Sequence, residues 1–305
     1  MNVVCRTIPS AAETSKGYLV VTVPPSGQAP HMVDHRYIGR GHKQKQYLSD
    51  AEVLRLHQRR RSVEVDLLGL LDKEVARDPV PNDQSHLFLL AEPLPGREGM
   101  LMDLVGKEGW QERLVKLQHE AVQKTQFTPR FSPDLTEASR QHRRPSGAAL
   151  SSYRLRGDRQ LSSESSSESV IDLEFSEDGG MRLYCSRLSD TLKDQRVLFD
   201  AGALTLTCQF IALLAAVTAE AGYLGMWGLG LRANNLAGLR SYEDLKGMWG
   251  DGPAYSEDNY DRTAMANYAD LSESPGRVAD ALLGRFLRAL GTNETHQKTL
   301  EKFGK

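Results

Sequence analysis

Short apolar runs bounded by proline, glycine or polar residues indicate the β-strands of this 305-residue chain. They predict strands at 17–23, 85–91, 170–175, 181–185 and 223–231. The run at 17–23 is apolar at nearly every position, which predicts a strand that is covered on both faces. Residues 31–33 and 36–38 flank Asp34 and His35, and this pattern predicts a hairpin with a two-residue turn.

Apolar residues at helical spacing indicate the helices. Ser49 and Glu52 have the spacing of a capping box, and the apolar positions from Val53 to Val75 predict one long helix or two consecutive helices. Further helices are predicted at 110–123, 200–221 and 275–290. The helix at 200–221 approaches the length of a membrane span, but its threonines and its glutamine favour a buried core helix, so no membrane is predicted as a partner.

Strands and helices follow one another without a regular strand-helix repeat, which predicts an α+β fold. Helical and strand periodicity disappears between residues 127 and 169, where proline and serine are frequent, and this predicts a mobile linker. The predicted division of the chain is a nucleic-acid-binding module at 1–60, a helical connector with one strand at 61–126, the linker at 127–169, an α+β domain at 170–291 and a polar tail at 292–305.

The charge of the chain is unevenly distributed along the sequence. Of all residues 40% are hydrophobic and 26% charged, which excludes a wholly disordered or collagen-like chain, and the formal net charge is -2. Residues 1–61 contain ten basic and four acidic residues, a balance of +6 that leaves -8 for the remainder. Such asymmetry indicates an anionic partner for the basic part, and a solvated surface with a local excess of charge is the alternative.

No catalytic residue, metal site or cofactor is predicted, and a non-enzymatic protein is favoured. The three cysteines lie far apart without a C-x-x-C pair, and the N-terminus lacks a secretory signal, so a reducing, cytoplasmic location is expected. His31 and His35 have no third ligand nearby in the sequence. Gly228-x-Gly230-x-x-Ala233 imitates a dinucleotide fingerprint, but no helix is predicted after it, and the chain has no phosphate-binding loop of the type G-x-x-x-x-G-K-[ST].

Residues 18–57 carry an ordered set of motifs. They are Val20-Val21-Thr22-Val23-Pro24-Pro25-Ser26, Pro30-His31, Arg36-Tyr37-Ile38-Gly39-Arg40-Gly41 and Leu48-Ser49-x-x-Glu52-x-x-x-Leu56. This set resembles the second half of the bacterial Schlafen AlbA-type DNA-binding domain, although Asp34-His35 stands where that family usually has Asp-Gly. The resemblance implies a small α+β module in a protein that binds nucleic acid or ATP, with Arg36 and Arg40 at the arginine positions of the family's hairpin. The family's first half would need more than the sixteen residues before Gly17, so the resemblance also implies an N-terminally truncated member.

The physical chemistry of the same region also predicts nucleic-acid binding. Arg36 and Arg40 are spaced by four residues across the predicted hairpin, so both can face one side of it, and guanidinium groups match phosphate oxygens in pairs. Tyr37 is a candidate stacking ring, with a place in the core as the alternative. The predicted binding residues for DNA or RNA are Arg36, Tyr37, Arg40, Lys43, Lys45, Arg59, Arg60 and Arg61.

Three alternatives stay open at this stage. The run Arg59 to Arg61 also fits the solvated face of a helix. The whole chain also fits a protein-interaction or regulatory module, in which the basic part contacts an acidic protein surface and the C-terminal domain supplies an apolar groove. An ATP-binding protein rests on the family resemblance alone. In addition, the strand at 18–23 is expected to lack neighbours, which predicts self-association into a homodimer.

Overall fold

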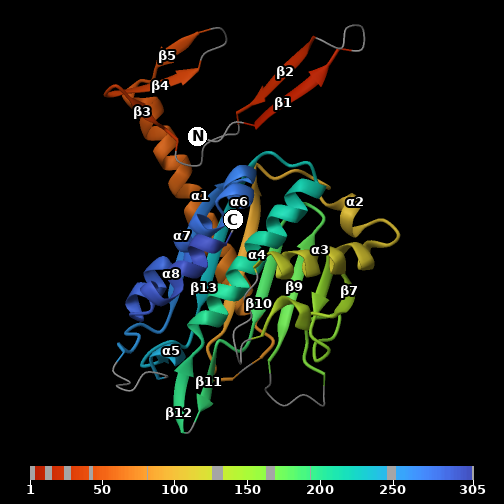
Figure 1. Ribbon diagram of the computed structural model, residues 1–305, viewed down its shortest axis with the longest axis vertical. Coiled ribbons are helices and arrows are strands. Elements are labelled where there is room, and N and C mark those ends of the chain that lie inside the picture. Colours follow the sequence, from red (N-terminus) through yellow and green to blue (C-terminus); the bar gives the residue numbers. More distant parts are fainter. Residues whose placement is uncertain are drawn as a thin grey trace.

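The computed structural model describes residues 4–10, 16–23, 29–40, 44–80, 82–125, 133–162, 169–192, 194–245 and 252–303. Its architecture is mixed α+β, with 40% helix and 29% strand, which confirms the predicted fold class. Figure 1 shows a body built around a large sheet and an arm that extends beyond one end of that sheet. We define the body as the described residues from 63 onward and the arm as the described residues from 4 to 62.

A seven-stranded sheet forms the centre of the body, in the order β15-β13-β6-β10-β9-β8-β7. Every neighbouring pair of its strands is antiparallel. The strands are β6 (Leu87–Leu94), β7 (Arg140–Arg144), β8 (Gly147–Ser151), β9 (Ile171–Ser176), β10 (Met181–Cys185), β13 (Met226–Ala233) and β15 (Tyr260–Asn267). A smaller sheet of the body contains β11 (Ser189–Leu192), β12 (Gln195–Leu198) and β14 (Arg240–Ser241).

Most helices of the body pack against one face of the large sheet (Figure 1). They are α2 (Met102–Val105), α3 (Trp110–Thr125), α4 (Asp200–Glu220), α6 (Tyr268–Glu273), α7 (Pro275–Ala289) and α8 (Asn293–Lys302). The body also contains the short helix α5 (Tyr242–Leu245) and the 3₁₀ helix η1 (Leu135–Glu137). Helix α4 lies in contact with α3, α6 and α7, which explains why it is apolar on most sides. Among the described residues, α4 is the one helix that is long and apolar enough to cross a membrane, and most of it is buried in the body.

The opposite face of the sheet is covered by the second half of α1 (Asp50–Ala76). Leu87 and Leu89 of β6 belong to the larger core, whereas Phe88 and Leu90 belong to the core under α1, because alternate residues of a strand point to opposite faces. Gly230 of β13 lets α1 approach closely, since a Cβ atom there would lie 3.1 Å from Leu71 Cδ1.

The arm consists of the first half of α1 and of two small β-sheets. One sheet contains β3 (Met32–Val33), β4 (Arg36–Arg40) and β5 (Lys45–Tyr47). The other is a two-stranded ribbon of β1 (Val4–Pro9) and β2 (Gly17–Thr22). The predicted strand at 17–23 therefore exists, but the prediction that both its faces are covered is wrong, since Tyr18 is 72% and Leu19 64% exposed.

The predicted division of the chain is also wrong in three places. Strand β6 of the supposed connector lies inside the large sheet, between β13 and β10, so the connector and the C-terminal domain share one sheet. Most of the supposed linker is ordered, because β7 and β8 extend the same sheet; its serine-rich part at 163–168 lies outside the described residues. The supposed polar tail contains α8, which packs on α7. In each case pairing with distant segments outweighs the local composition.

Candidate nucleic-acid interface

The β3–β4 hairpin is built as the sequence predicts. Met32 pairs with Tyr37 and Val33 with Arg36, which leaves Asp34 and His35 as the two-residue turn. Both turn residues have positive φ, 49° and 61°, as a type I′ turn requires. Strand β5 then pairs antiparallel with the rest of β4, with Ile38 opposite Tyr47 and Arg40 opposite Lys45.

One face of this small sheet combines cationic and aromatic side chains. Arg36 and Ile38 of β4 share that face with Lys45 and Tyr47 of β5, because side chains alternate along each strand. The guanidinium carbon of Arg36 lies 4.8 Å from the centroid of the Tyr47 ring, within the range of a cation–π interaction. Arg36, Lys45 and Tyr47 are all exposed, and Tyr47 is 64% exposed. We call Arg36, Lys45 and Tyr47, with the backbone position of Arg40, the basic face.

The other face of the sheet packs on α1. The ring of Tyr37 meets that of His57 edge-on, with 6.4 Å between the centroids. The Leu48 amide donates a hydrogen bond of 3.0 Å to the Tyr37 carbonyl. Gly39 makes this packing possible, since a Cβ atom there would lie 2.4 Å from Leu48 Cδ2. The basic face therefore points away from α1, into solvent.

Helix α1 begins at the predicted capping box. The Ser49 amide donates to Glu52 Oε2 over 2.8 Å, and the Glu52 amide donates to Ser49 Oγ over 3.4 Å. Hydrogen bonds from the backbone and the side chain of Ser49 lower the pKa of the Glu52 carboxyl. The cap fixes the helix start directly after β5, so the sheet and the first turns of α1 are joined without a long loop.

The three consecutive arginines lie on the exposed part of α1. Consecutive helical residues are 100° apart, so the three cannot share one side of the helix. Arg60 and Arg61 follow His57 by three and four residues and lie on the side that faces the small sheet, whereas Arg59 lies on the opposite side. Within the described part of the chain no ion pair forms at Arg36, Lys45 or any of these three arginines.

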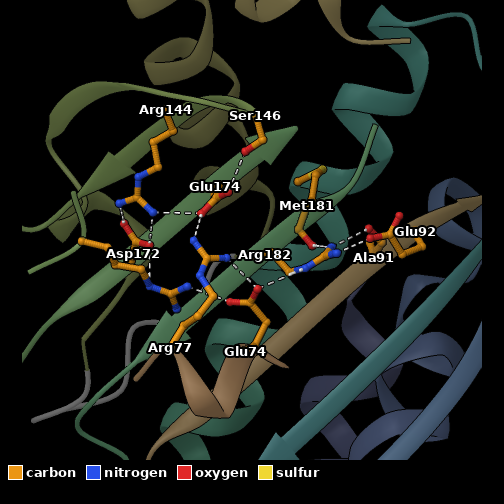
Figure 2. Close-up of polar contacts among 11 residues, drawn as sticks. Glu74, Arg77, Ala91, Glu92, Arg144, Ser146, Asp172, Glu174, Met181 and Arg182 are labelled. Atoms are coloured by element: carbon orange, nitrogen blue, oxygen red, sulfur yellow. Dashed lines mark hydrogen bonds and ion pairs between the residues drawn. The ribbon is translucent and has the colours of Figure 1, made fainter. Parts of the chain in front are cut away.

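Several arginines of the body form ion pairs instead, and Figure 2 shows a cluster of them among carboxylates. Arg144 donates to both oxygens of Asp172, over 2.7 and 3.0 Å, and to Glu174 over 2.9 Å. Arg159 donates to Glu74 over 2.7 Å and lies 3.2 Å from Asp172.

Two further arginines complete this cluster. Arg77 of the α1 C-cap contacts Glu74 at 2.9 Å and Glu174 at 3.2 Å. Arg182 pairs with Glu92 and lies 3.7 Å from Glu74 (Figure 2). We call these four arginines and four carboxylates the ionic cluster. Its charges balance, and it joins the end of α1 to β6, β9 and β10, so it anchors the helix that carries the arm.

Burial and pairing act in opposite directions on two carboxylates of the ionic cluster. Burial raises the pKa of Asp172, and the charges of Arg144 and Arg159 only partly oppose it. Burial would also raise the pKa of Glu174, but the charges of Arg77 and Arg144 outweigh it and lower that pKa. In both carboxylates the arginines favour the ionised form against burial, and these ion pairs tie the sheet to the end of α1.

The predicted binding residues separate into distinct groups. Arg36 and Lys45 lie together on the basic face, and the register places Arg40 across from Lys45. Lys43 and the side chain of Arg40 lie outside the described residues. Tyr37 is on the other face, half-buried against His57, so the structure does not bring it together with Arg36 and Lys45.

Sequence reasoning missed Tyr47, which is the exposed ring of the basic face. Alternation in β5 would have placed Tyr47 beside Lys45, but β5 has three residues and was too short to be predicted. Neither the pair His31 and His35 nor the motif Gly228-x-Gly230-x-x-Ala233 forms a metal or nucleotide site among the described residues. Among the described residues no three metal-ligating side chains gather, and Gly228 and Gly230 lie in the middle of β13 without a phosphate loop.

Comparison with known proteins adds no relative. A scan against protein-family models finds no match to this chain. Searches of the curated proteins and of the solved structures find no match either. The functional argument therefore rests on the residues and on their geometry.

Proposed function

We propose that this protein binds nucleic acid through the arm, mainly by contacts to phosphates. The observation that carries the proposal is the difference between the two sets of arginines. Several arginines of the body, including the buried Arg144 and Arg159, lie in ion pairs, whereas the described cations of the basic face and Arg59 to Arg61 form no ion pair and are exposed. Unpaired guanidinium and ammonium groups on one projecting element are what a polyanion requires. The resemblance of residues 18–57 to the Schlafen AlbA-type domain supports the same function.

The basic face favours single-stranded nucleic acid. Tyr47 offers an exposed ring beside Arg36 and on the same face as Lys45, and bases of a single strand stack on such rings while the backbone follows the positive charge. A pair of antiparallel strands such as β4 and β5 also fits the major groove of duplex DNA, so duplex binding is the competing outcome. The Arg36 guanidinium over Tyr47 holds the ring in place before any ligand arrives.

The test is a titration of fluorescent single-stranded and duplex DNA and RNA with the full chain, at several salt concentrations. Phosphate contacts predict that the logarithm of the binding constant falls linearly with the logarithm of salt concentration, by about 0.7 to 0.9 per phosphate contacted. Replacing Arg36 and Arg40 together by Ala is expected to make this slope shallower by about 1.4 to 1.8.

The matched control replaces Arg277 and Arg285 by Ala. Both are exposed arginines on α7 of the body, so the control removes the same charge from another surface. Its slope is expected to stay that of the unmodified protein. An equal loss of slope in the two double variants would show that net charge, and not the basic face, determines binding. Absence of binding at low salt would overturn the proposal.

A protein partner is the second candidate, and one observation favours it. A hollow of about 840 Å³ lies between α3, α4, α6 and α8, with Ala215, Leu271 and Phe303 among its lining residues. Lys124 and Lys302 also line this hollow, so its surface is partly apolar and partly polar, and a partner segment with both kinds of side chain would fit it. Capture of one protein that survives nuclease treatment and is lost on replacing Ala215 by Glu would support this candidate. The third candidate is an ATP-binding protein, and it is tested by adding ATP as a competitor of the oligonucleotides.

A further inference from the structure

The β1–β2 ribbon leaves an unusual amount of apolar surface open. Six large apolar residues of this short segment are at least 41% exposed: Ile8, Tyr18, Leu19, Val20, Val21 and Val23. Both faces of β2 are apolar, and within the described chain no strand other than β1 pairs with it. An isolated two-stranded ribbon is marginally stable in water, so this element needs a partner.

The hydrogen bonds of the ribbon determine which backbone groups are free. The Ser10 amide donates to the Lys16 carbonyl over 2.8 Å, which makes residues 10 and 16 a hydrogen-bonded pair. Bonded and non-bonded pairs alternate in an antiparallel ladder, so the pairs Ile8–Tyr18 and Arg6–Val20 are bonded as well. The amide and carbonyl groups of Leu19 and Val21 consequently point outward, to the open edge of β2.

The two outer edges of the ribbon differ in chemistry. Strand β1 carries Arg6, and Pro9 at its end has no amide hydrogen to offer. Strand β2 contains neither charge nor proline from Gly17 to Thr22. Proteins protect an open edge with charged residues, proline or bulges, and β2 has none of these. The edge of β2 is therefore chemically suited to pair with another uncharged strand.

We propose that β2 pairs with β2 of a second copy of this chain, antiparallel and centred on Leu19. In this register the outward groups of Leu19 bond those of Leu19 in the second copy, and Gly17 pairs with Val21. Tyr18 then lies opposite Val20, an aromatic and β-branched pair that stabilises sheets. Lys16 lies opposite Thr22, so no like charges meet. The result is a four-stranded sheet in the order β1-β2-β2-β1.

The self-complementary sequence selects a second copy over other occupants. A polyanion would find no cation on the β2 edge, and a charged peptide strand would place its charges against apolar residues. The two-fold pairing satisfies the same groups on both chains at once. It would also bring two basic faces into one particle, so that a long nucleic acid could engage both. The dimer itself does not depend on the proposed nucleic-acid binding.

Cysteine cross-linking tests the register. Cys5 is exposed while Cys185 and Cys208 are buried, so Cys5→Ser removes the one exposed thiol among the described residues. In that background Leu19→Cys places two thiols on residues whose Cα atoms lie about 5.5 Å apart, within disulfide range. Val21→Cys is the matched control, because the two Val21 positions would be about 14 Å apart, too far for a disulfide.

Mild oxidation is expected to convert Leu19→Cys largely into a covalent dimer and to leave Val21→Cys monomeric on a denaturing gel. Equal cross-linking of both variants would overturn the proposed register. Light scattering gives the second measurement, with twice the 33.9 kDa chain mass expected for the unmodified protein. A monomer at high concentration would overturn the dimer.

Charge substitutions separate the β2 edge from the rest of the ribbon. Leu19→Lys would place two like charges opposite each other and is expected to give a monomer. Thr7→Lys adds the same charge on the cross-strand neighbour of Leu19 in β1, away from the contact, and is expected to stay dimeric. A dimer in both variants, or a monomer in both, would contradict pairing through β2. Binding of an oligonucleotide too short for two copies should be equal in all these proteins, which separates this test from that of the proposed function.

Discussion

Replacing Arg144 by Met is expected to destabilise the protein strongly at neutral pH. Arg144 makes three hydrogen bonds to Asp172 and Glu174, and both the arginine and Asp172 are almost fully buried. Methionine preserves much of the volume but leaves Asp172 with the Arg159 contact alone. Removing one partner of a buried ion pair costs about 3–5 kcal/mol, because the remaining charge stays buried without compensation.

The loss should depend on pH in a definite direction. Burial raises the pKa of Asp172, and the variant lacks the charge that opposes it most, so its folded pKa rises further above the ordinary 3.8. A carboxyl whose folded pKa is raised destabilises the fold progressively as the pH rises from its unfolded pKa to its folded pKa, and the loss is complete above the folded pKa. The variant is therefore expected to recover part of its stability as the pH falls from neutral toward 4.

Urea unfolding followed by tryptophan fluorescence measures this effect, because Trp110 and Trp227 are buried in the folded protein. Arg156→Met is the matched control, because Arg156 pairs with Asp158 at 3.0 Å on the surface, where such a pair contributes less than about 1 kcal/mol. An Arg144→Met loss as small as the control's would refute the assigned role of the ionic cluster. Hydrogen exchange should also quicken along α1 if the cluster anchors this helix to the sheet.

Three further predictions concern other parts of the molecule. Burial would raise the pKa of Asp200, but hydrogen bonds from His296 and other neighbours outweigh it and lower that pKa. The ionised Asp200 therefore stabilises the fold above its unfolded pKa, and this stabilisation is lost on acidification. Asp200→Asn should make the free energy of unfolding in urea fall less between neutral and acidic pH. Gly230→Val should lower the free energy of unfolding by about 1–3 kcal/mol in the same assay, because the valine side chain would press against α1. Gly69→Ala is the control, since Gly69 lies in open space on α1, and it should raise that free energy by about 0.5–1 kcal/mol. Tyr47→Ala should weaken single-strand binding by about 1–3 kcal/mol, and Tyr153→Ala, which removes a similar exposed tyrosine in the body, should leave it unchanged.

Local signals in the sequence predict local structure correctly. The turn at Asp34 and His35 and the cap of Ser49 with Glu52 both follow from residues within four positions of one another. Strong periodicity likewise finds α4 and most strands of the large sheet. The turn and the cap are decided by interactions within one segment, whereas for α4 and these strands the apolar pattern of one segment identifies the element.

Structure that depends on contacts between distant segments cannot be predicted from local sequence patterns. Strand β7 has the sequence Arg-Gln-His-Arg-Arg and becomes a strand only because β8 pairs with it. The ionic cluster combines residues of α1, β6, β7, β9, β10 and the loop that holds Arg159, and no spacing in the sequence relates them. Tyr47 was missed for the same reason, since its place on the basic face follows from its register with Ile38.

The separation of arm and body explains how exposed cations persist in a protein with a slightly negative net charge. Residues 1–61 carry +6 and the remainder -8, so the two parts attract each other. The first half of α1, residues 50–62, is about 20 Å long and holds the basic face away from the body. This exceeds the screening length of about 8 Å at physiological salt, so the body neutralises the basic face only weakly. A phosphate chain that reaches the basic face consequently meets cations that need not first be released from carboxylates, and the salt dependence of binding should report contacts of the arm alone.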